Sequence, residues 1–171
     1  MHAAVLNALG EAPRYDTFDD PVASEHHEVV RVLAAGVNHL DLAKASGTFY
    51  TGPPPVPSVV GSDGVGVTDG GRRVFFDAPV APFGSWADRA LVTSADLFDV
   101  ADGVSDAAAA ALGNTGLAAW LALEWRAQLE PGESVLVLAA SGALGSVAVQ
   151  VARLLGAGKH AKAFLFSFGH F

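Results

Sequence analysis

The sequence predicts an α/β protein with a mainly β N-terminal part. Short β-branched and aromatic runs, separated by Gly, Pro and Asp, fill the chain before Ser105, and Ala-rich helical periodicity follows it. Closer to the C-terminal end, an apolar run, a Gly-containing turn and a second helical pattern follow one another. This order of strand, turn and helix is how a dinucleotide-binding fold begins.

The N-terminal part is predicted to be a small barrel or sandwich. Its strands share β-branched or aromatic residues bounded by turn formers, and they are predicted at 3–6, 28–35, 59–67, 72–76 and 86–92. One helix is predicted at 40–44. The run 52–57 contains consecutive prolines and therefore predicts a stiff extended loop.

Helical periodicity begins after this part. An Ala-rich helix is predicted at 106–112, with Ser105 or Asp106 as its N-cap, and a second helix at 114–125. Pro131-Gly132 then predicts a turn.

The segment after this turn predicts one strand and one helix. Residues 134–139 form the strand, and its continuous apolar centre is typical of a parallel strand that is buried on both faces. Residues 143–155 form the helix, with Val147, Val151 and Leu154 on one face.

Small residues fill the turn between this strand and this helix. The candidate cofactor-binding residues are Ser141, Gly142, Ala143, Leu144 and Gly145. Small residues allow the free N–H groups at a helix N-terminus to approach a pyrophosphate. However, the full G-x-G-x-x-G pattern is not met, and helix–strand packing also favours Gly and Ala. From their spacing alone, these small residues could serve either cofactor binding or helix–strand packing.

Composition argues against several classes of function. The formal net charge is −8 without any basic cluster, which argues against a nucleic-acid partner. The absence of cysteine rules out disulfides and thiolate zinc sites. The N-terminus lacks the pattern of a signal peptide, and the apolar stretch 135–149 is shorter than the ~20 residues that span a membrane. We therefore expect a cytoplasmic protein with no membrane partner.

Several blocks of the sequence, taken in order, resemble the medium-chain dehydrogenase/reductase superfamily, and its quinone oxidoreductase branch most of all. The blocks are AAGVNHLD at 34–41, GTFY at 47–50, PSVVGSDGVGV at 57–67, AALGNTGLAAW at 110–120, PGESVLV at 131–137 and an A-x-x-G-x-x-G turn at 139–145. The resemblance extends to about Gly158.

The resemblance implies two domains. A GroES-like barrel at 1–108 carries the substrate side, and residues 109–158 begin an incomplete Rossmann fold that carries NAD(P)H. A complete doubly wound sheet has about six strands, and only its first strand and helix are expected here. Residues 159–171 do not resemble the family and are expected to be an unrelated tail, so the chain is expected to be truncated.

The zinc ligands of related alcohol dehydrogenases are missing from the pattern. The positions that match a Cys and a His ligand hold Asn38 and Ser62. Neither residue is a zinc ligand at such a site, so no metal is expected. The tandem His26-His27 lies in a polar turn and is expected to be exposed.

Without a metal, hydrogen bonds must stabilise the negative charge that develops on a substrate oxygen. The resemblance implies Asn38 and Tyr50 as the catalytic donors. Asn38 could equally be a buried structural amide, and Tyr50 a lid. Thr115 resembles the family residue that lies against the nicotinamide, with helix capping as its alternative. Asp41 also matches a family position, but bonding to a neighbouring loop is favoured for it.

The implied activity belongs to the complete enzyme. It is the quinone reductase type of NADPH-dependent hydride transfer to a quinone or conjugated (enal-like) carbonyl, and complete relatives are expected to be homodimers. NADPH is favoured over NADH because no Asp or Glu follows Gly145, although NADH stays an alternative, and Lys162 lies in the tail. The chain alone is expected to be inactive. Two alternatives are a non-catalytic truncated barrel that binds small apolar ligands and a zinc alcohol dehydrogenase relative.

Overall fold

The computed structural model describes residues 1–158 and 162–164. The chain forms two compact units, Met1–Gly113 (unit 1) and Asn114–Phe171 (unit 2). The division lies inside one long helix, a few residues after the boundary expected between 108 and 109.

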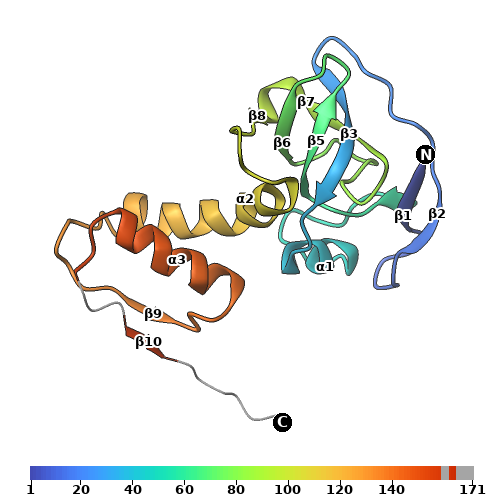
Figure 1. Ribbon diagram of the computed structural model, residues 1–171. Coiled ribbons are helices and arrows are strands. Elements are labelled where there is room, and N and C mark those ends of the chain that lie inside the picture. Colours follow the sequence, from blue (N-terminus) through green and yellow to red (C-terminus); the bar gives the residue numbers. More distant parts are fainter. Residues whose placement is uncertain (159–161, 165–171) are drawn as a thin grey trace. The chain divides into compact units, whose positions relative to one another are not determined.

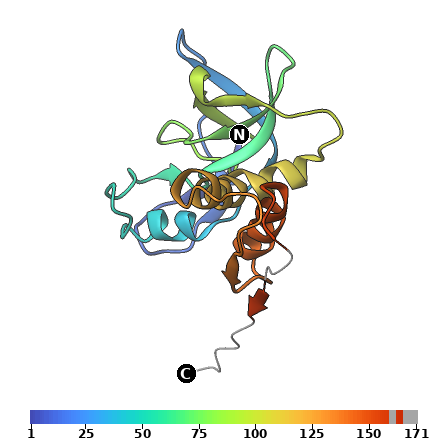
Figure 2. The ribbon, with the colours of Figure 1, turned by 90° about the vertical axis from the view of Figure 1, so that its left-hand side faces the viewer.

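Unit 1 is mainly β, and its largest element is a curled antiparallel sheet of five strands in the order β7-β3-β5-β6-β8 (Figure 1). These strands are β3 (His27–Ala35), β5 (Asp63–Thr68), β6 (Arg73–Asp77), β7 (Arg89–Thr93) and β8 (Leu97–Asp99). A second sheet has the order β2-β1-β4 and consists of β1 (His2–Leu6), β2 (Arg14–Thr17) and β4 (Ser58–Val59). The two sheets form a half-barrel, in line with the expected barrel, and Figure 2 shows the curl of the strands from the side.

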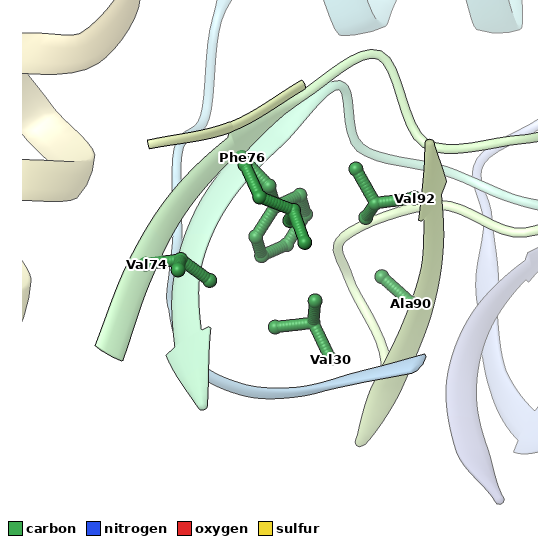
Figure 3. Close-up of a cluster of buried hydrophobic side chains, with 6 residues drawn as sticks. Val30, Val74, Phe76, Ala90 and Val92 are labelled. Carbon is green, nitrogen blue, oxygen red and sulfur yellow. The ribbon is translucent and has the colours of Figure 1, made fainter. Parts of the chain in front are cut away.

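The core of unit 1 lies on the inner face of the five-stranded sheet. Val30, Val74, Phe76, Ala90 and Val92 are completely buried there and point toward one another (Figure 3). Alternate residues of a strand face the same side of the sheet. Val74 and Phe76 on β6 therefore share the inner face, as do Ala90 and Val92 on β7. The β-branched and aromatic runs that predicted these strands thus supply most of the core.

Most of the predicted strands of unit 1 are present, with shifted ends. The strand predicted at 59–67 is two strands, β4 and β5, because residues 60–62 bend between the two sheets. The strand predicted at 86–92 begins at Arg89, after a loop in which Trp86 donates its indole N–H to the Gly36 carbonyl at 2.8 Å. The short edge strands β2 and β8 were not predicted, since neither alternates strongly enough.

The two helices predicted at 106–112 and 114–125 are one continuous element. Helix α2 (Asp106–Trp120) runs directly into a π-helical segment, η2 (Leu121–Arg126). Gly113, which suggested a break, is instead a packing position, since a Cβ there would collide with the Phe75 ring. Ser105 accepts a hydrogen bond from the Ala108 N–H at 3.2 Å, which confirms it as the capping residue.

Unit 2 contains a β-α-β element. Strand β9 (Leu136–Leu138) leads into α3 (Ala143–Leu154), and β10 (Lys162–Phe164) then pairs with β9 in parallel. Figure 1 shows β10 next to β9. The expectation of only one strand was therefore wrong, because part of the tail takes the second position in the sheet.

The predicted burial of unit 2 was also wrong in part. Leu136 and Leu138 are 61% and 59% exposed, although their strand was expected to be buried on both faces. On α3, Val151 is buried as expected, but Leu154 is 77% exposed, and Ala152 is buried in its place. The strand and helix have these exposed faces because β9 has a single neighbouring strand among the described residues.

No helix in the described part of the chain is long and apolar enough to cross a membrane.

Candidate functional site

Asn38 lies where strand β3 has ended and helix α1 (His39–Ala45) begins. It is the N-cap residue of α1, and its backbone N–H donates to Asp41 Oδ2 at 2.8 Å. Its side-chain Nδ2 donates to Asp63 Oδ1, also at 2.8 Å. The Asn38 side chain thus bonds to a buried carboxylate. Asp41 accepts from the N-cap of its own helix, and no bond from Asp41 to a neighbouring loop is found in the part of the chain that the structure describes.

Strand register explains why residues 25 positions apart meet. Ala35 at the end of β3 pairs with Gly64 at the start of β5, so the chain after β3 passes directly over Asp63. Gly36 makes this approach possible, because a Cβ there would overlap the Asp63 carboxylate. Asp63 is 2% exposed, and it was not among the residues singled out from the sequence.

Lys44, one turn after Asp41, brings a positive charge to the same region. Its Nζ donates to Ser62 Oγ at 3.0 Å and lies 5.8 Å from the centre of the Phe49 ring. Ser62 is 3% exposed, and it is the residue that the resemblance matched to a zinc ligand. Sequence reasoning missed Lys44, although the loss of a ligand at Ser62 could have prompted a search for a charged replacement.

Tyr50 lies beyond the end of α1 and is 87% exposed. Its ring packs against Phe49 with the ring centres 4.4 Å apart. Tyr50 and Asn38 are not joined by a hydrogen bond within the described residues of unit 1, and the role of each as a catalytic donor stays a prediction.

The two residues that the resemblance matches to zinc ligands each have another partner. Asn38 is engaged by Asp63, and Ser62 by an ammonium group, which would repel a cation. Among the residues that the structure describes, no group of three or more His, Cys, Asp or Glu side chains could hold a metal ion. His26 is exposed, as expected for its turn, while the partly buried His27 bonds through Nδ1 to Ser24 Oγ at 2.9 Å.

The candidate cofactor turn leads into helix α3 through Gly142. Gly142 is the N-cap of α3, in extended conformation, and no side chain caps the helix there. Gly145 is buried, and a Cβ on it would meet the backbone of Ala139 and come within 2.7 Å of Ala140 Cα. A glycine at this position is therefore required for the close helix–strand packing of a dinucleotide fold.

Of the other turn residues, Ala143 and Leu144 are exposed, as is Ser141.

The placement expected for Thr115 was wrong. It does not begin a helix but lies well inside α2, because α2 continues through Gly113 without a break. Helix capping is thus excluded for Thr115, and its contact with a nicotinamide is untested.

Comparison with known proteins identifies relatives for most of the chain. No family model matches it. The quinone oxidoreductase of Homo sapiens is 33% identical over 146 residues, which cover 80% of this chain and 44% of that protein. The quinone oxidoreductase from Thermus thermophilus, solved alone and in complex with NADPH, is 41% identical with a TM-score of 0.83. It aligns with 92% of this chain, which covers 51% of that structure.

A second solved structure gives the same result. The quinone oxidoreductase of Pseudomonas syringae pv. Tomato is 33% identical over 92% of this chain and 51% of its own, with a TM-score of 0.82. The chain therefore spans about half the length of the relatives it matches.

Proposed function

Because the chain is homologous to the N-terminal half of the quinone oxidoreductases of the medium-chain dehydrogenase/reductase type, we propose that it supplies the substrate side and the first phosphate-binding turn of an NADPH-dependent quinone reductase. The observation that carries the proposal is the combination of this homology with the turn at Gly142–Gly145. The acceptor is a quinone or another conjugated carbonyl compound.

The cofactor turn supports the NADPH part of this proposal. Helix α3 begins at Gly142 without a side-chain cap, so the backbone N–H groups of its first turn can bind one phosphate oxygen. Gly145 holds the helix close enough to β9 for that approach. When bound, NADPH supplies the hydride, and the protein supplies orientation and stabilisation of charge.

Asn38 and Tyr50 are the proposed donors to the acceptor oxygen. The Asn38 amide has two N–H groups and gives one of them to Asp63, which fixes its orientation and leaves the other for a ligand. The Tyr50 hydroxyl is on an exposed side chain and is therefore accessible. Donors aimed at an oxygen where negative charge develops lower the barrier to hydride addition.

We further propose that this chemistry does not use zinc. The two positions that would hold the metal are occupied by an amide that bonds to Asp63 and by a hydroxyl that bonds to Lys44. The same observation disfavours the zinc alcohol dehydrogenase alternative.

Titration of the ¹⁵N-labelled chain with NADPH tests the cofactor part of the proposal. The largest shifts are expected at the amides of Ala143, Leu144 and Gly145, in the first turn of α3, whereas the Gly142 N–H already donates to the Ala139 carbonyl at 2.9 Å. Binding is expected to be weak, since one turn contacts one phosphate. NADPH shifts that spare this turn would contradict the proposal. Tight binding by a monomeric chain would show that unit 2 is sufficient as a cofactor module.

A further inference from the structure

A cavity of about 300 Å³ lies within unit 1, between the C-terminal half of α1, the proline loop at 52–57 and the loop at 79–83. This volume is at the lower end of the range for small-molecule sites. Neither Asn38 nor Tyr50 lines the cavity, so it is separate from the proposed donors to the acceptor oxygen. Among the described residues that line it, the charged ones are Asp41 and Lys44. Most of the others are apolar and include Leu6, Pro54, Val59, Pro82 and Phe83.

Asp41 places a buried carboxylate on the wall of this cavity. It is 3% exposed, and its Oδ2 accepts a hydrogen bond from the Asn38 backbone N–H. Its Oδ1 has no hydrogen-bond partner among the described residues. Buried polar atoms are rarely left unpaired, and a buried charge is normally matched by an opposite charge. The Asp41 Oδ1 atom therefore lacks a donor, and a cationic donor would match it best.

Lys44 places an ammonium group on the same wall, one helical turn from Asp41. Its Nζ donates to Ser62 Oγ at 3.0 Å. An ammonium group has three N–H donors, so bonding to Ser62 leaves donors for another acceptor. No ion pair joins Lys44 to Asp41, or to any other carboxylate in the described part of the chain. The Lys44 ammonium therefore lacks an anionic partner.

The charge pattern of the cavity indicates the charge of its ligand. One face of α1 carries a negative and a positive group that are not paired with each other, within walls that are otherwise mostly apolar. A simple cation would match Asp41 but be repelled by Lys44, and a simple anion would match Lys44 but be repelled by Asp41. A ligand that carries both charges gives each group an opposite partner.

We propose that this cavity binds a small zwitterion with an apolar body, of which an aliphatic α-amino acid is the simplest example. The ligand ammonium donates to Asp41 Oδ1, and the ligand carboxylate accepts from the Lys44 ammonium. The ligand side chain packs against Pro54, Val59 and Phe83. Hydrogen bonds between charged groups are roughly twice as strong as those between neutral groups, so these two contacts select for the zwitterion. The site is additional to the proposed function and does not depend on it.

The test is titration of the ¹⁵N-labelled 171-residue chain with L-leucine, without cofactor. Saturable shifts are expected at amides of the cavity, such as those of Ala45, Gly52 and Val60. Two analogues of leucine each lack one charge: isopentylamine lacks the carboxylate, and 4-methylpentanoate lacks the ammonium. Each analogue is expected to bind about tenfold or more weakly than leucine, because it loses one hydrogen bond between charged groups.

Two variants assign each ligand charge to its partner. Asp41→Asn keeps an oxygen for the Asn38 N–H but puts an amide donor in place of Oδ1. It is expected to weaken leucine binding about tenfold or more, without weakening 4-methylpentanoate binding. Lys44→Met removes the ammonium and is expected to weaken leucine binding by a similar factor, without weakening isopentylamine binding. Asp102→Asn and Arg126→Met, at exposed positions outside the cavity, are the matched controls and are expected to leave leucine binding unchanged.

The comparison of leucine with its two analogues needs no variant, so it tests the proposal even if Asp41→Asn or Lys44→Met does not fold, as judged by circular dichroism. Absence of saturable leucine binding, shifts confined to unit 2, or equal affinities for leucine and either analogue would each overturn the proposal. Unchanged leucine affinity in a folded Asp41→Asn or Lys44→Met chain would do the same. None of these measurements involves NADPH or a quinone, so the proposed function is tested separately.

Discussion

At the scale of single residues, the sequence identified Asn38 as a candidate but not the residues that position it. Asp63 fixes the Asn38 amide, and Lys44 binds the neighbouring Ser62. Both contacts depend on the pairing of β3 with β5 and on the position of α1 near the start of β5. Local patterns predict each element, but they do not give the register that brings these side chains within hydrogen-bonding distance.

The proposed roles of Asn38 and Tyr50 can be measured in a chimera that joins residues 1–158 to the C-terminal half of the Thermus thermophilus relative. Asn38→Ala and Tyr50→Phe are expected to lower kcat for quinone reduction by up to ~10²–10³, because each donor matters most as charge develops. The KM for NADPH is expected to change much less.

His39→Ala, at the residue next to Asn38, is the matched control for this experiment and is expected to keep the kcat of the unmodified chimera. If kcat survived both Asn38→Ala and Tyr50→Phe, these residues would have structural roles only.

At the scale of elements, the sequence predicted the main strands and helices but not their continuity or burial. β-Branched and aromatic residues predicted β3 and β6, and several of these residues form the core of unit 1. The helices predicted at 106–112 and 114–125 are continuous because the glycine between them, a poor helix former, packs against Phe75. β10 was missed because its residues lie in a Phe-rich tail that does not resemble the family, and its pairing with β9 is a tertiary contact.

The turn between β9 and α3 gives a prediction on stability. Gly145→Ala is expected to destabilise unit 2 by about 2–3 kcal/mol, because the added Cβ meets backbone atoms that cannot rotate away. Gly142→Ala is the matched control, since its Cβ would lie 3.4 Å from the Ala139 carbonyl, an ordinary contact.

Urea unfolding of both variants, followed through amide resonances of unit 2, measures the difference. The control is expected to stay within about 1 kcal/mol of the unmodified chain. Equal effects from the two substitutions would mean that the helix–strand approach does not depend on Gly145.

At the scale of the whole molecule, the two units differ in how fully their elements are covered. Unit 1 has a closed apolar core, with Val30, Phe76 and Val92 completely buried. Unit 2 keeps large apolar side chains in contact with solvent, among them Trp125 at 74% exposed. The family resemblance correctly predicted the fold, and the apolar run correctly predicted a strand. The burial of that strand on both faces was not correctly predicted, because it requires neighbouring strands that the described residues do not include.

The central claim, that this chain supplies the substrate side of an NADPH-dependent quinone reductase, is tested most directly by anaerobic turnover of the chimera. NADPH loss and hydroquinone formation are measured together, with duroquinone as acceptor and exhaustively dialysed, zinc-free protein. We predict equal amounts of NADPH consumed and hydroquinone formed, over many turnovers. A folded chimera that bound NADPH but reduced no quinone, or did so only after zinc was added, would contradict the account.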